Sequence, residues 1–392
     1  MNIVKKVAII PLRAGSKGIK HKNRKKMLGR PLFSWVLLEA YKSVLDEIYV
    51  FTDDDNVIQY VSDEYAYLGK IKIMKRSKES ATDEASTEYA MKEFIGRINN
   101  NYDIICLLQA TSPLTTKDDI NKVVEKVEKD KYDASLTVVR NKRFIWNENG
   151  TAVNYDYIKR PRRQEFGGFL VENGAVYATT RKQFEESGTR IGGKISLVEM
   201  PSDTLIEIDE SSDWIIVEEL MKNRLRRNKA RESRIKAVFL DVDGVLTNGG
   251  TYFTEDGELL KKFSMRDGMG LEILKENDIH VFVVTSEKSK IVKSRMEKLG
   301  ITDFFLGVKD KYALVEYTLR EIGLSRSECA YIGDDINDLA NMLSIGWSFC
   351  PNNAMREVIA NSDFVLHNNG GNEAVREAID FILSYNRRRG SV

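Results

Sequence analysis

The amino-acid sequence predicts two α/β domains, each built on a mostly parallel sheet with helices on its faces. The chain has 392 residues, more than one domain usually holds. From residue 7 onward, short apolar runs alternate with helix-length segments, as in βαβ units. A second progression of this kind begins at residues 237–246, where an apolar run leads into two aspartates and a glycine. A new fold therefore starts in mid-chain.

The composition indicates a protein that acts on small molecules. Its 60 basic and 59 acidic residues nearly cancel, so no overall field favours nucleic acid or a membrane as a partner. Cys106, Cys329 and Cys350 lack Cys-x-x-Cys spacing, and we expect reduced cysteines rather than metal ligands. We expect neither a secretory leader nor a membrane span, because the N-terminal residues lack an apolar h-region and no apolar run approaches the length of a span. We expect a cytoplasmic protein.

The first apolar run, residues 7–12, leads directly into a loop rich in glycine and basic residues. Glycine lets a ligand approach the backbone, and hydroxyl and basic groups donate to phosphate oxygens. The spacing is not that of a Walker A loop, and the alternative is an exposed basic turn. The candidate phosphate-binding residues are Arg13, Ser16, Lys17 and Lys22.

Further elements continue the alternation of strand and helix. Helices are predicted at residues 32–40 and 117–129, and strands at residues 47–53 and 104–109. Gln109 ends the last of these, where open α/β sheets place ligands. The alternative for Gln109 is a proline-containing turn that only reverses the chain.

Four segments together resemble the acylneuraminate cytidylyltransferases, also called CMP-sialic acid synthetases. They are residues 13–23, Arg76 with residues 81–83, residues 107–114, and residues 173–177. The resemblance spans nearly all of residues 1–225 and implies a nucleotide-diphospho-sugar transferase-like sheet that couples a sugar acid to CTP. It implies that CTP is bound by Arg13, Ser16, Lys17, Lys22, Arg76, Thr82 and Gln109 and that the sugar faces Gln164 and Asn173.

Residues 160–164 gather three arginines around a proline. Their guanidinium groups repel one another unless an anion, a carboxylate or a phosphate, binds them. In the family that this half resembles, the dimer partner contributes the equivalent stretch to the site, which implies a homodimer through the first domain. Arg162 and Arg163 are therefore candidate sugar ligands. The alternative is a solvated basic loop.

Residues 205–209 alternate apolar and acidic side chains, which predicts a strand. Glu207 and Asp209 would then lie on one face, about 7 Å apart, and could share Mg²⁺ bound to CTP. The resembled family usually has aspartate at both positions, so Glu207 leaves the number of metal ions open. The alternative is an edge strand with its acidic face in water.

A basic run joins the two halves. Ser211 is predicted to cap a helix, and residues 222–236 that follow are strongly basic and lack aromatic side chains. We expect domains at residues 1–228 and 235–392, with a solvated helical linker at residues 229–234.

The second half carries motifs of a phosphate-transferring site. Asp241 and Asp243 end the apolar run at residues 237–240, and Thr285 and Ser286 end another. With Lys311 before a helix, and Asp334 and Asp338 after a third run, they resemble the four ordered motifs of the haloacid dehalogenase superfamily. This resemblance covers about the last two fifths of the chain and implies a Rossmann-like phosphatase domain.

The resemblance assigns a role to each of these residues. Asp241 would attack phosphorus, Asp243 would protonate the leaving alcohol, and Asp334 would hold Mg²⁺ with Asp241 and the Asp243 carbonyl. Thr285 and Ser286 would donate to phosphate oxygens, Lys311 would neutralise them, and Asp338 would orient the loop or Lys311. Mg²⁺ is thus expected in both domains.

The spacing of these motifs leaves no room for an inserted cap domain. Only a hairpin fits between residues 249 and 263, and only a helix and a strand fit between residues 288 and 311. Water must then be excluded by a neighbouring subunit, as in the capless sugar-acid phosphatases that this half resembles. We expect a tetramer through the second domain.

Three charged residues are candidates for determining which sugar acid the second half accepts. Related eight-carbon phosphatases carry Thr-Gly-Arg where this chain has Thr285-Ser286-Glu287, so a glutamate stands in place of their arginine. The pattern of Glu287, Arg295 and Lys298 resembles that of the branch that acts on 2-keto-3-deoxynononate 9-phosphate. Glu287 and Lys298 would be about 16 Å apart along a helix. We therefore expect Glu287 to serve its own site, and Arg295 and Lys298 an adjacent subunit's. The alternative is a solvated charged helix.

Together these expectations describe a bifunctional enzyme. It would release a nine-carbon 2-keto-3-deoxy sugar acid from its 9-phosphate and couple that acid to CMP from CTP, releasing pyrophosphate. One alternative is N-acetylneuraminate 9-phosphate phosphatase with CMP-N-acetylneuraminate synthetase. Another is a nucleotide-sugar sensor or scaffold with inactive sites.

Overall fold

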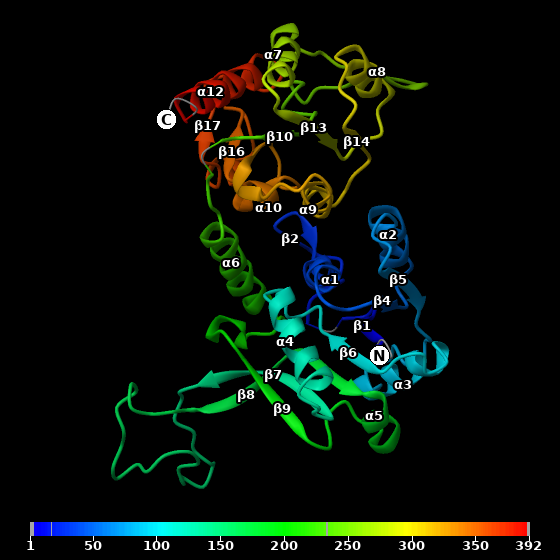
Figure 1. The fold of residues 1–392 in the computed structure, drawn as a ribbon, viewed down its shortest axis with the longest axis vertical. Helices are drawn as coiled ribbons and strands as arrows, with labels where there is room; N and C mark the ends of the chain where they lie inside the picture. Colours follow the sequence, from blue (N-terminus) through cyan, green and yellow to red (C-terminus); the bar gives the residue numbers. More distant parts are fainter. Residues whose placement is uncertain (1–3, 17, 233, 390–392) are drawn as a thin grey trace. The chain divides into compact units, whose positions relative to one another are not determined.

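The computed structural model describes residues 4–16, 18–232 and 234–389, which form two compact units (Figure 1). The first unit comprises Met1–Lys26 and Pro31–Leu220, and the second comprises Met27–Arg30 and Met221–Val392. The expected phosphate-loop residue Lys17 lies outside the described residues. The unit boundary falls before residue 221, whereas the sequence predicted it after residue 228.

The first unit is built on a seven-stranded sheet in the order β5-β4-β1-β6-β8-β7-β9. Its strands are β1 (Lys6–Leu12), β4 (Glu47–Thr52), β5 (Ile71–Lys75), β6 (Ile104–Leu108), β7 (Ala134–Asn141), β8 (Phe169–Thr180) and β9 (Ile195–Met200). Strand β8 runs antiparallel to both β6 and β7, and the other pairings are parallel. The predicted mostly parallel sheet is confirmed.

Helices cover both faces of this sheet. They are α1 (Leu32–Lys42), α2 (Asp55–Tyr65), α3 (Thr87–Arg97), α4 (Lys117–Glu128) and α5 (Arg181–Ser187), with the 3-10 turn η1 (Ser202–Leu205) after β9. Val7 and Ile9 of β1 pack in one cluster with Phe94 of α3. The alternate residues Ala8 and Ile10 are also fully buried, as expected for a strand covered on both faces.

The second unit is built on a six-stranded, all-parallel sheet in the order β14-β13-β10-β15-β16-β17. Its strands are β10 (Ala237–Leu240), β13 (His280–Thr285), β14 (Phe304–Leu306), β15 (Cys329–Ile332), β16 (Trp347–Cys350) and β17 (Phe364–Val365). Only the hairpin of β11 (Tyr252–Thr254) and β12 (Gly257–Leu260) and helix α7 separate β10 from β13, so the expected lack of a cap is confirmed.

Helices sandwich the second sheet as well. They are α7 (Met265–Glu276), α8 (Lys290–Lys298), α9 (Lys311–Glu321), α10 (Leu339–Ser344), α11 (Arg356–Ile359) and α12 (Ala374–Arg389), with the 3-10 turn η2 (Arg326–Glu328). Val238 and Leu240 of β10 pack with α7, α8 and α12. Phe239 packs with α9 and α10 on the other face. Strand β10 is therefore central and buried, as its apolar sequence predicted.

The predicted solvated linker is wrong. Helix α6 (Ser211–Arg227) carries the start of the basic run, and within the second unit Lys222 pairs with Glu357 at 2.6 Å. Lys229 and Arg231 both pair with Asp363. These acidic partners lie more than a hundred residues away in the sequence, so a local charge count could not reveal them.

The predicted strand at residues 205–209 is also wrong. The 3-10 turn η1 ends at Leu205, and residues 206–209 form no strand. The Ile208 amide instead donates to the Thr111 carbonyl, and the Asp213 carboxylate accepts from the Asp209 amide. Hydrogen bonds within loops thus satisfy these backbone amides, which the alternating pattern had predicted to pair with a neighbouring β-strand.

A long arm, residues 142–168, extends from the first sheet between β7 and β8 (Figure 1). Aromatic rings pack against one another along it, and the ring centroid of Phe144 lies 4.2 Å from that of Tyr155 and 5.0 Å from that of Phe166. Ile158 nevertheless stays 78% exposed. Among the helices that the structure describes, none is long and apolar enough to span a membrane.

Candidate active sites

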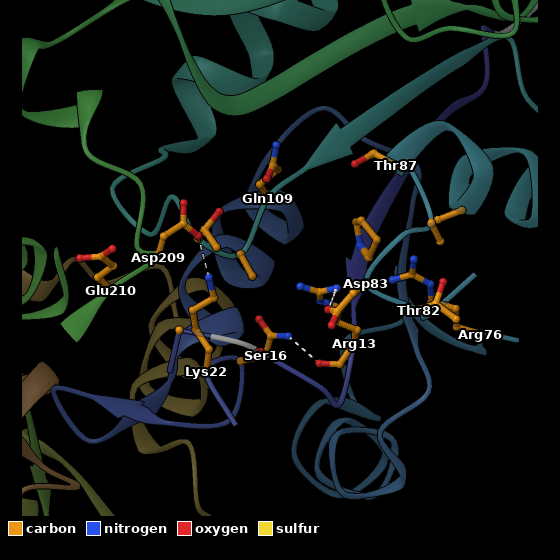
Figure 2. A pocket seen from close by; sticks show the side chains of 17 residues that line it. Arg13, Ser16, Lys22, Arg76, Thr82, Asp83, Thr87, Gln109, Asp209 and Glu210 are labelled. Atoms are coloured by element: carbon orange, nitrogen blue, oxygen red, sulfur yellow. Dashed lines mark hydrogen bonds and ion pairs between the residues drawn. The ribbon is translucent and has the colours of Figure 1, made fainter. Parts of the chain in front are cut away.

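The first unit contains a cavity of about 590 Å³ at the carboxyl ends of β1 and β6 (Figure 2). Open α/β sheets place ligands at such strand ends. The predicted nucleotide ligands that line the cavity are Arg13, Ser16, Lys22, Arg76, Thr82 and Gln109. The structure therefore brings together every described member of the predicted CTP set.

Ion pairs hold the basic side chains of this cavity in place. Arg13 contacts Asp83 at 2.5 Å, and Lys22 contacts Asp209 at 2.9 Å, as Figure 2 shows. Lys22 also donates to the Ile208 carbonyl at 2.7 Å. Arg76 is buried and donates to the hydroxyl and carbonyl of Ser80. An anionic ligand would meet guanidinium and ammonium groups whose positions are already fixed, which lowers the entropy lost on binding.

Only one of the two acidic candidates for the first metal site lines the cavity. Asp209 lines the cavity, whereas Glu207 does not. The Glu207 carboxylate lies against Gly174, where an added Cβ would come within 2.1 Å of its oxygen. Burial and the nearby Asp209 raise the pKa of Glu207. The structure therefore brings only Asp209 of the pair to the cavity, where its exposed carboxylate could hold Mg²⁺.

The expected sugar ligands of the first unit lie apart from the cavity. Asn173 is fully buried, accepts from the Thr137 hydroxyl at 2.7 Å and donates to the Thr204 carbonyl at 3.2 Å. Its side chain therefore joins β7, β8 and η1 and does not line the cavity. The other three candidates are exposed on the arm, namely Arg162, Arg163 and Gln164.

A second site lies at the carboxyl edge of the second sheet. Asp241 and Asp334 follow β10 and β15, and Thr285 is the last residue of β13, so the parallel register of these neighbouring strands brings the three side chains together. Lys311, the first residue of α9, contacts Asp241 Oδ2 at 2.6 Å and Asp338 Oδ1 at 2.8 Å. The sequence predicted all of these residues.

The Lys311 ammonium is fully buried between these carboxylates. Burial alone would lower the pKa of Lys311, but the charges of Asp241 and Asp338 raise it above its ordinary value. Asp338 also accepts from the Tyr331 hydroxyl at 2.7 Å and from the Asp334 amide at 3.2 Å. Asp338 thus contacts both Lys311 and the loop after β15, and the sequence predicted that it would orient one or the other of these two groups.

The acidic residues at this edge fit a divalent cation. Asp241, Asp334 and Asp338 each bring a carboxylate oxygen within 4.8 Å of the others. Asp334 Oδ1 is buried with no hydrogen-bond partner among the described residues, and Gly244 leaves space that a Cβ would fill, 1.9 Å from Asp334 Oδ2. Burial and the neighbouring carboxylates raise the pKa of Asp334 to about 8. Burial also raises the pKa of Asp241 to about 7, although Lys311 opposes this.

The two hydroxyl residues at the end of β13 differ in their contacts. Ser286 donates to the Val308 carbonyl and accepts from Asn337, both at 3.0 Å. Thr285 is buried and its hydroxyl oxygen accepts from the Glu287 amide at 3.2 Å. Because the Ser286 hydrogen is already used, Thr285 is the better placed of the two to donate to a phosphate.

The three sugar-specificity candidates of the second unit lie around α8. Glu287 is exposed just after β13, and its carboxylate is 3.9 Å from Lys309. Arg295 lies over the Phe263 ring and donates weakly to the Ser264 carbonyl at 3.4 Å. Lys298, at the end of α8, is exposed.

Sequence reasoning missed several residues of this second site. Lys261 contacts Asp243 Oδ1 at 2.6 Å, and Arg30 contacts Asp310, the N-cap residue of α9, at 2.8 Å. Tyr331 contacts Asp338 from within β15. Arg30 and Tyr331 carry no local signal, but two adjacent lysines at 261 and 262, one of them on the inward face of a hairpin, could have been noticed.

The two halves match two protein families. The cytidylyltransferase profile matches residues 7–183, and the haloacid dehalogenase-like hydrolase profile matches residues 254–350. N-acylneuraminate cytidylyltransferase B of Danio rerio is 31% identical over 395 residues, covering 98% of this chain and 91% of that protein. Both expected enzyme classes, nucleotidyltransferase and hydrolase, are therefore confirmed.

Relatives of the second half alone are phosphatases. The 3-deoxy-D-manno-octulosonate 8-phosphate phosphatase KdsC of Haemophilus influenzae is 40% identical over 149 residues, covering 38% of this chain and 83% of that protein. The structure of the Moraxella catarrhalis enzyme, with magnesium, phosphate and KDO, is 31% identical with a TM-score of 0.39 and covers 44% of this chain and 95% of that one. Because the similarity to N-acylneuraminate cytidylyltransferase B extends over both units, the chain belongs to the N-acylneuraminate cytidylyltransferase family and carries a haloacid dehalogenase-like hydrolase domain.

Proposed function

We propose that the second unit dephosphorylates a nine-carbon 2-keto-3-deoxy sugar acid 9-phosphate and that the first unit couples the free acid to CMP. The observation that carries the proposal is the pair of sites in one chain. One is a cavity of about 590 Å³ lined by Arg13, Lys22 and Arg76. The other is a buried Lys311 between Asp241 and Asp338. The product of the hydrolase is then the substrate of the transferase.

In the first unit, Arg13, Lys22 and Arg76 bind the CTP phosphates, and Gln109 contacts the nucleoside. The anomeric hydroxyl of the sugar acid attacks the α-phosphorus, and pyrophosphate leaves with its charge matched by these cations. Mg²⁺ held by Asp209 would neutralise further phosphate charge. Arg162, Arg163 and Gln164 lie exposed on the arm. We infer that they bind the sugar acid of a dimer partner.

In the second unit, Asp241 attacks phosphorus while Thr285 and Lys311 bind the phosphate oxygens. Asp338 keeps Lys311 in place, and Asp243 gives a proton to the leaving sugar oxygen. Asp241, Asp334 and the Asp243 carbonyl would hold Mg²⁺, which would offset the negative charge of carboxylates and phosphate. A tetramer through this unit would exclude water and bring Arg295 and Lys298 to a neighbouring site.

Reciprocal substitutions test the two activities. Asp241→Asn should abolish phosphate release but leave CTP-dependent transfer, because it removes the nucleophile and changes only the site of the second unit. Asp209→Asn should reduce transfer and leave phosphate release. Both are measured on the full chain, as inorganic phosphate from the sugar-acid phosphate and as pyrophosphate from CTP with the free acid. Parallel loss of both activities in either variant would contradict the assignment.

The nine-carbon preference has a separate test. The kcat/KM values for the phosphates of 2-keto-3-deoxynononate and 3-deoxy-D-manno-octulosonate are measured with wild type and with Lys298→Ala. Lys293→Ala, on the same helix, is the control. We expect wild type to prefer the nine-carbon phosphate and Lys298→Ala alone to lose kcat/KM on it. Equal rates on both substrates before and after substitution would contradict the preference, and better turnover of N-acetylneuraminate 9-phosphate would favour that alternative.

A further inference from the structure

The hairpin of the second unit ends in a buried cation. Lys261 directly follows β12, and its side chain is 2% exposed. Its ammonium lies 2.6 Å from Asp243 Oδ1 and 3.2 Å from Glu258 Oε1. A buried ammonium group is unfavourable unless anions pair with it, so these two carboxylates fix its position.

Glu258 is itself fixed from another element. Its Oε2 accepts from the hydroxyl of Ser289, and Ser289 caps α8 by accepting from the Val292 amide at 3.2 Å. A continuous chain of polar contacts therefore runs from the start of α8 through Glu258 and Lys261 to Asp243. The hairpin contributes directly to the position of the Asp243 side chain.

The two oxygens of Asp243 have different surroundings. Oδ1 accepts from Lys261 and, at 3.3 Å, from the Thr247 hydroxyl. Oδ2 is buried and has no hydrogen-bond partner among the described residues. A carboxylate held by one oxygen keeps a single orientation, and its second oxygen remains available for another group.

We propose that Lys261 is a positioning residue of the phosphatase. It holds Oδ1 of Asp243 so that Oδ2 exchanges the proton with the substrate. This inference rests on the proposed phosphatase function and adds to it the group that selects the reactive oxygen. Lys261 itself does not touch the reacting atoms.

The proton transfers balance over the two steps. In the first, a carboxylate oxygen of Asp241 bonds to phosphorus, the bond from phosphorus to the sugar oxygen breaks, and that oxygen keeps the electron pair and takes the proton from Oδ2. In the second, a water oxygen bonds to phosphorus and returns a proton to Oδ2. The bond from phosphorus to Asp241 then breaks, and inorganic phosphate leaves.

A purely structural role for Lys261 makes a different prediction. If Lys261 only stabilises the hairpin, its loss weakens turnover of every phosphate ester alike. If it positions the proton donor, the loss depends on the leaving group, because a good leaving group departs without a proton. The ratio kcat/KM reports only the steps up to departure of the leaving group, so it isolates this effect.

The test compares Lys261→Met with Lys262→Met in the full chain with Mg²⁺. The two lysines are adjacent, but Lys262 is exposed. The substrates are 2-keto-3-deoxynononate 9-phosphate, with a poor alkoxide leaving group, and p-nitrophenyl phosphate, with a good one. For Lys261→Met we expect kcat/KM to fall on the order of 100-fold on the sugar phosphate and less than about fivefold on the aryl phosphate. Lys262→Met should match wild type on both.

Two further variants keep the test decisive if Lys261→Met folds poorly. Lys261→Arg should recover most of the loss on the sugar phosphate, and Glu258→Gln, which keeps the lysine, should show a smaller loss with the same dependence on leaving group. Asp243→Asn combined with Lys261→Met should be no worse than Asp243→Asn alone, because both act through one group.

Equal losses on the two substrates, no loss, or additive losses with Asp243→Asn would overturn the role of Lys261. If wild type released phosphate from neither substrate, the proposed phosphatase activity would be contradicted, and so would the inference that rests on it. Activity in wild type with an equal loss in Lys261→Met rejects the inference alone. The two failures are therefore distinct.

Discussion

Lys311 and Asp338 place opposite charges in contact where neither side chain reaches solvent. Each charge is tolerated because the other is present, and Asp241 and Tyr331 complete the group. Removing one partner of a buried ion pair leaves an uncompensated charge, which costs more than the pair contributes. The same contacts that hold the site ready for phosphate thus stabilise the fold.

We therefore expect Lys311→Met to abolish phosphate release and to lower the free energy of unfolding of the second unit by about 3 kcal/mol. Urea unfolding followed by circular dichroism measures the stability, and CTP-dependent transfer should persist. Lys293→Met is the control, because Lys293 is exposed and lies 3.9 Å from Glu297 on α8. A similar loss of stability in both variants would contradict the account.

Binding of Mg²⁺ should depend on pH. Burial raises the pKa of Asp241 to about 7 and that of Asp334 to about 8, so without a cation these groups bind protons below those values. A cation requires the ionised carboxylates, and its binding should release protons and weaken as pH falls from 8 to 6. Calorimetric titration of Mg²⁺ in buffers of different ionisation enthalpy measures the protons released.

The direction of the effect follows from the raised pKa values, since lowered values would leave Mg²⁺ affinity constant over this range. Asp334→Asn removes one of the two titrating groups and should release fewer protons while binding Mg²⁺ more weakly. Proton release in wild type that is absent, or unchanged by Asp334→Asn, would contradict the assignment.

At the scale of elements, the basic run after α6 binds to the second unit rather than to solvent. Lys229 donates to the Ser348 hydroxyl and the Met342 carbonyl, each at 3.2 Å, and pairs with Asp363. Burial lowers the pKa of Lys229, and Asp363 partly restores it. This segment is therefore part of the second unit's fold, although its composition is typical of a linker.

Lys229→Ala should lower the stability of the second unit by about 2 kcal/mol, since it removes a buried cation from Asp363, which keeps Arg231 and the Ser348 amide and hydroxyl. The exposed Arg227 is the matched control, and Arg227→Ala should change stability by less than about 0.5 kcal/mol. Thermal unfolding of the full chain measures both. Equal effects would mean that the basic run acts through its net charge.

The sequence predicted elements well where pattern and burial agree and poorly where distant partners decide. Strands β10 and β13, both apolar and followed by polar residues, form as expected. Residues 205–209 alternate as a strand does, but the Ile208 amide bonds to the loop carbonyl of Thr111 and these residues form no strand. Asp241 and Lys311 were predicted because motif spacing fixes them, whereas Lys261 was missed because only the folded hairpin brings it to Asp243.

At the scale of the whole molecule, each unit has its own sheet and core clusters. We expect fragments of residues 1–228 and 221–392 to fold separately, the first retaining transfer and the second phosphate release. The second fragment should melt below the full chain, because it lacks Arg30, which pairs with the buried Asp310. A fragment of residues 235–392, without Lys222 and Lys229, should melt lower still.

Activity assays and differential scanning calorimetry of the fragments check this prediction. The full chain carrying Arg30→Met serves as the reference for the lost ion pair, and its second unit should melt at a temperature close to that of the 221–392 fragment. Loss of both activities on separation would show that the units do not fold independently.

The central position of β10 also has a consequence for biosynthesis. Ala237 pairs with His280 on one side and with Cys329 on the other, so β10 leaves the ribosome long before its second neighbour exists. At about 5–20 residues per second, the newly made strand waits roughly 5–20 s for β15. During that interval an apolar edge is open to pairing with other nascent chains. Expression at lower temperature or with chaperones that bind unfolded segments should therefore raise the soluble yield of the second unit.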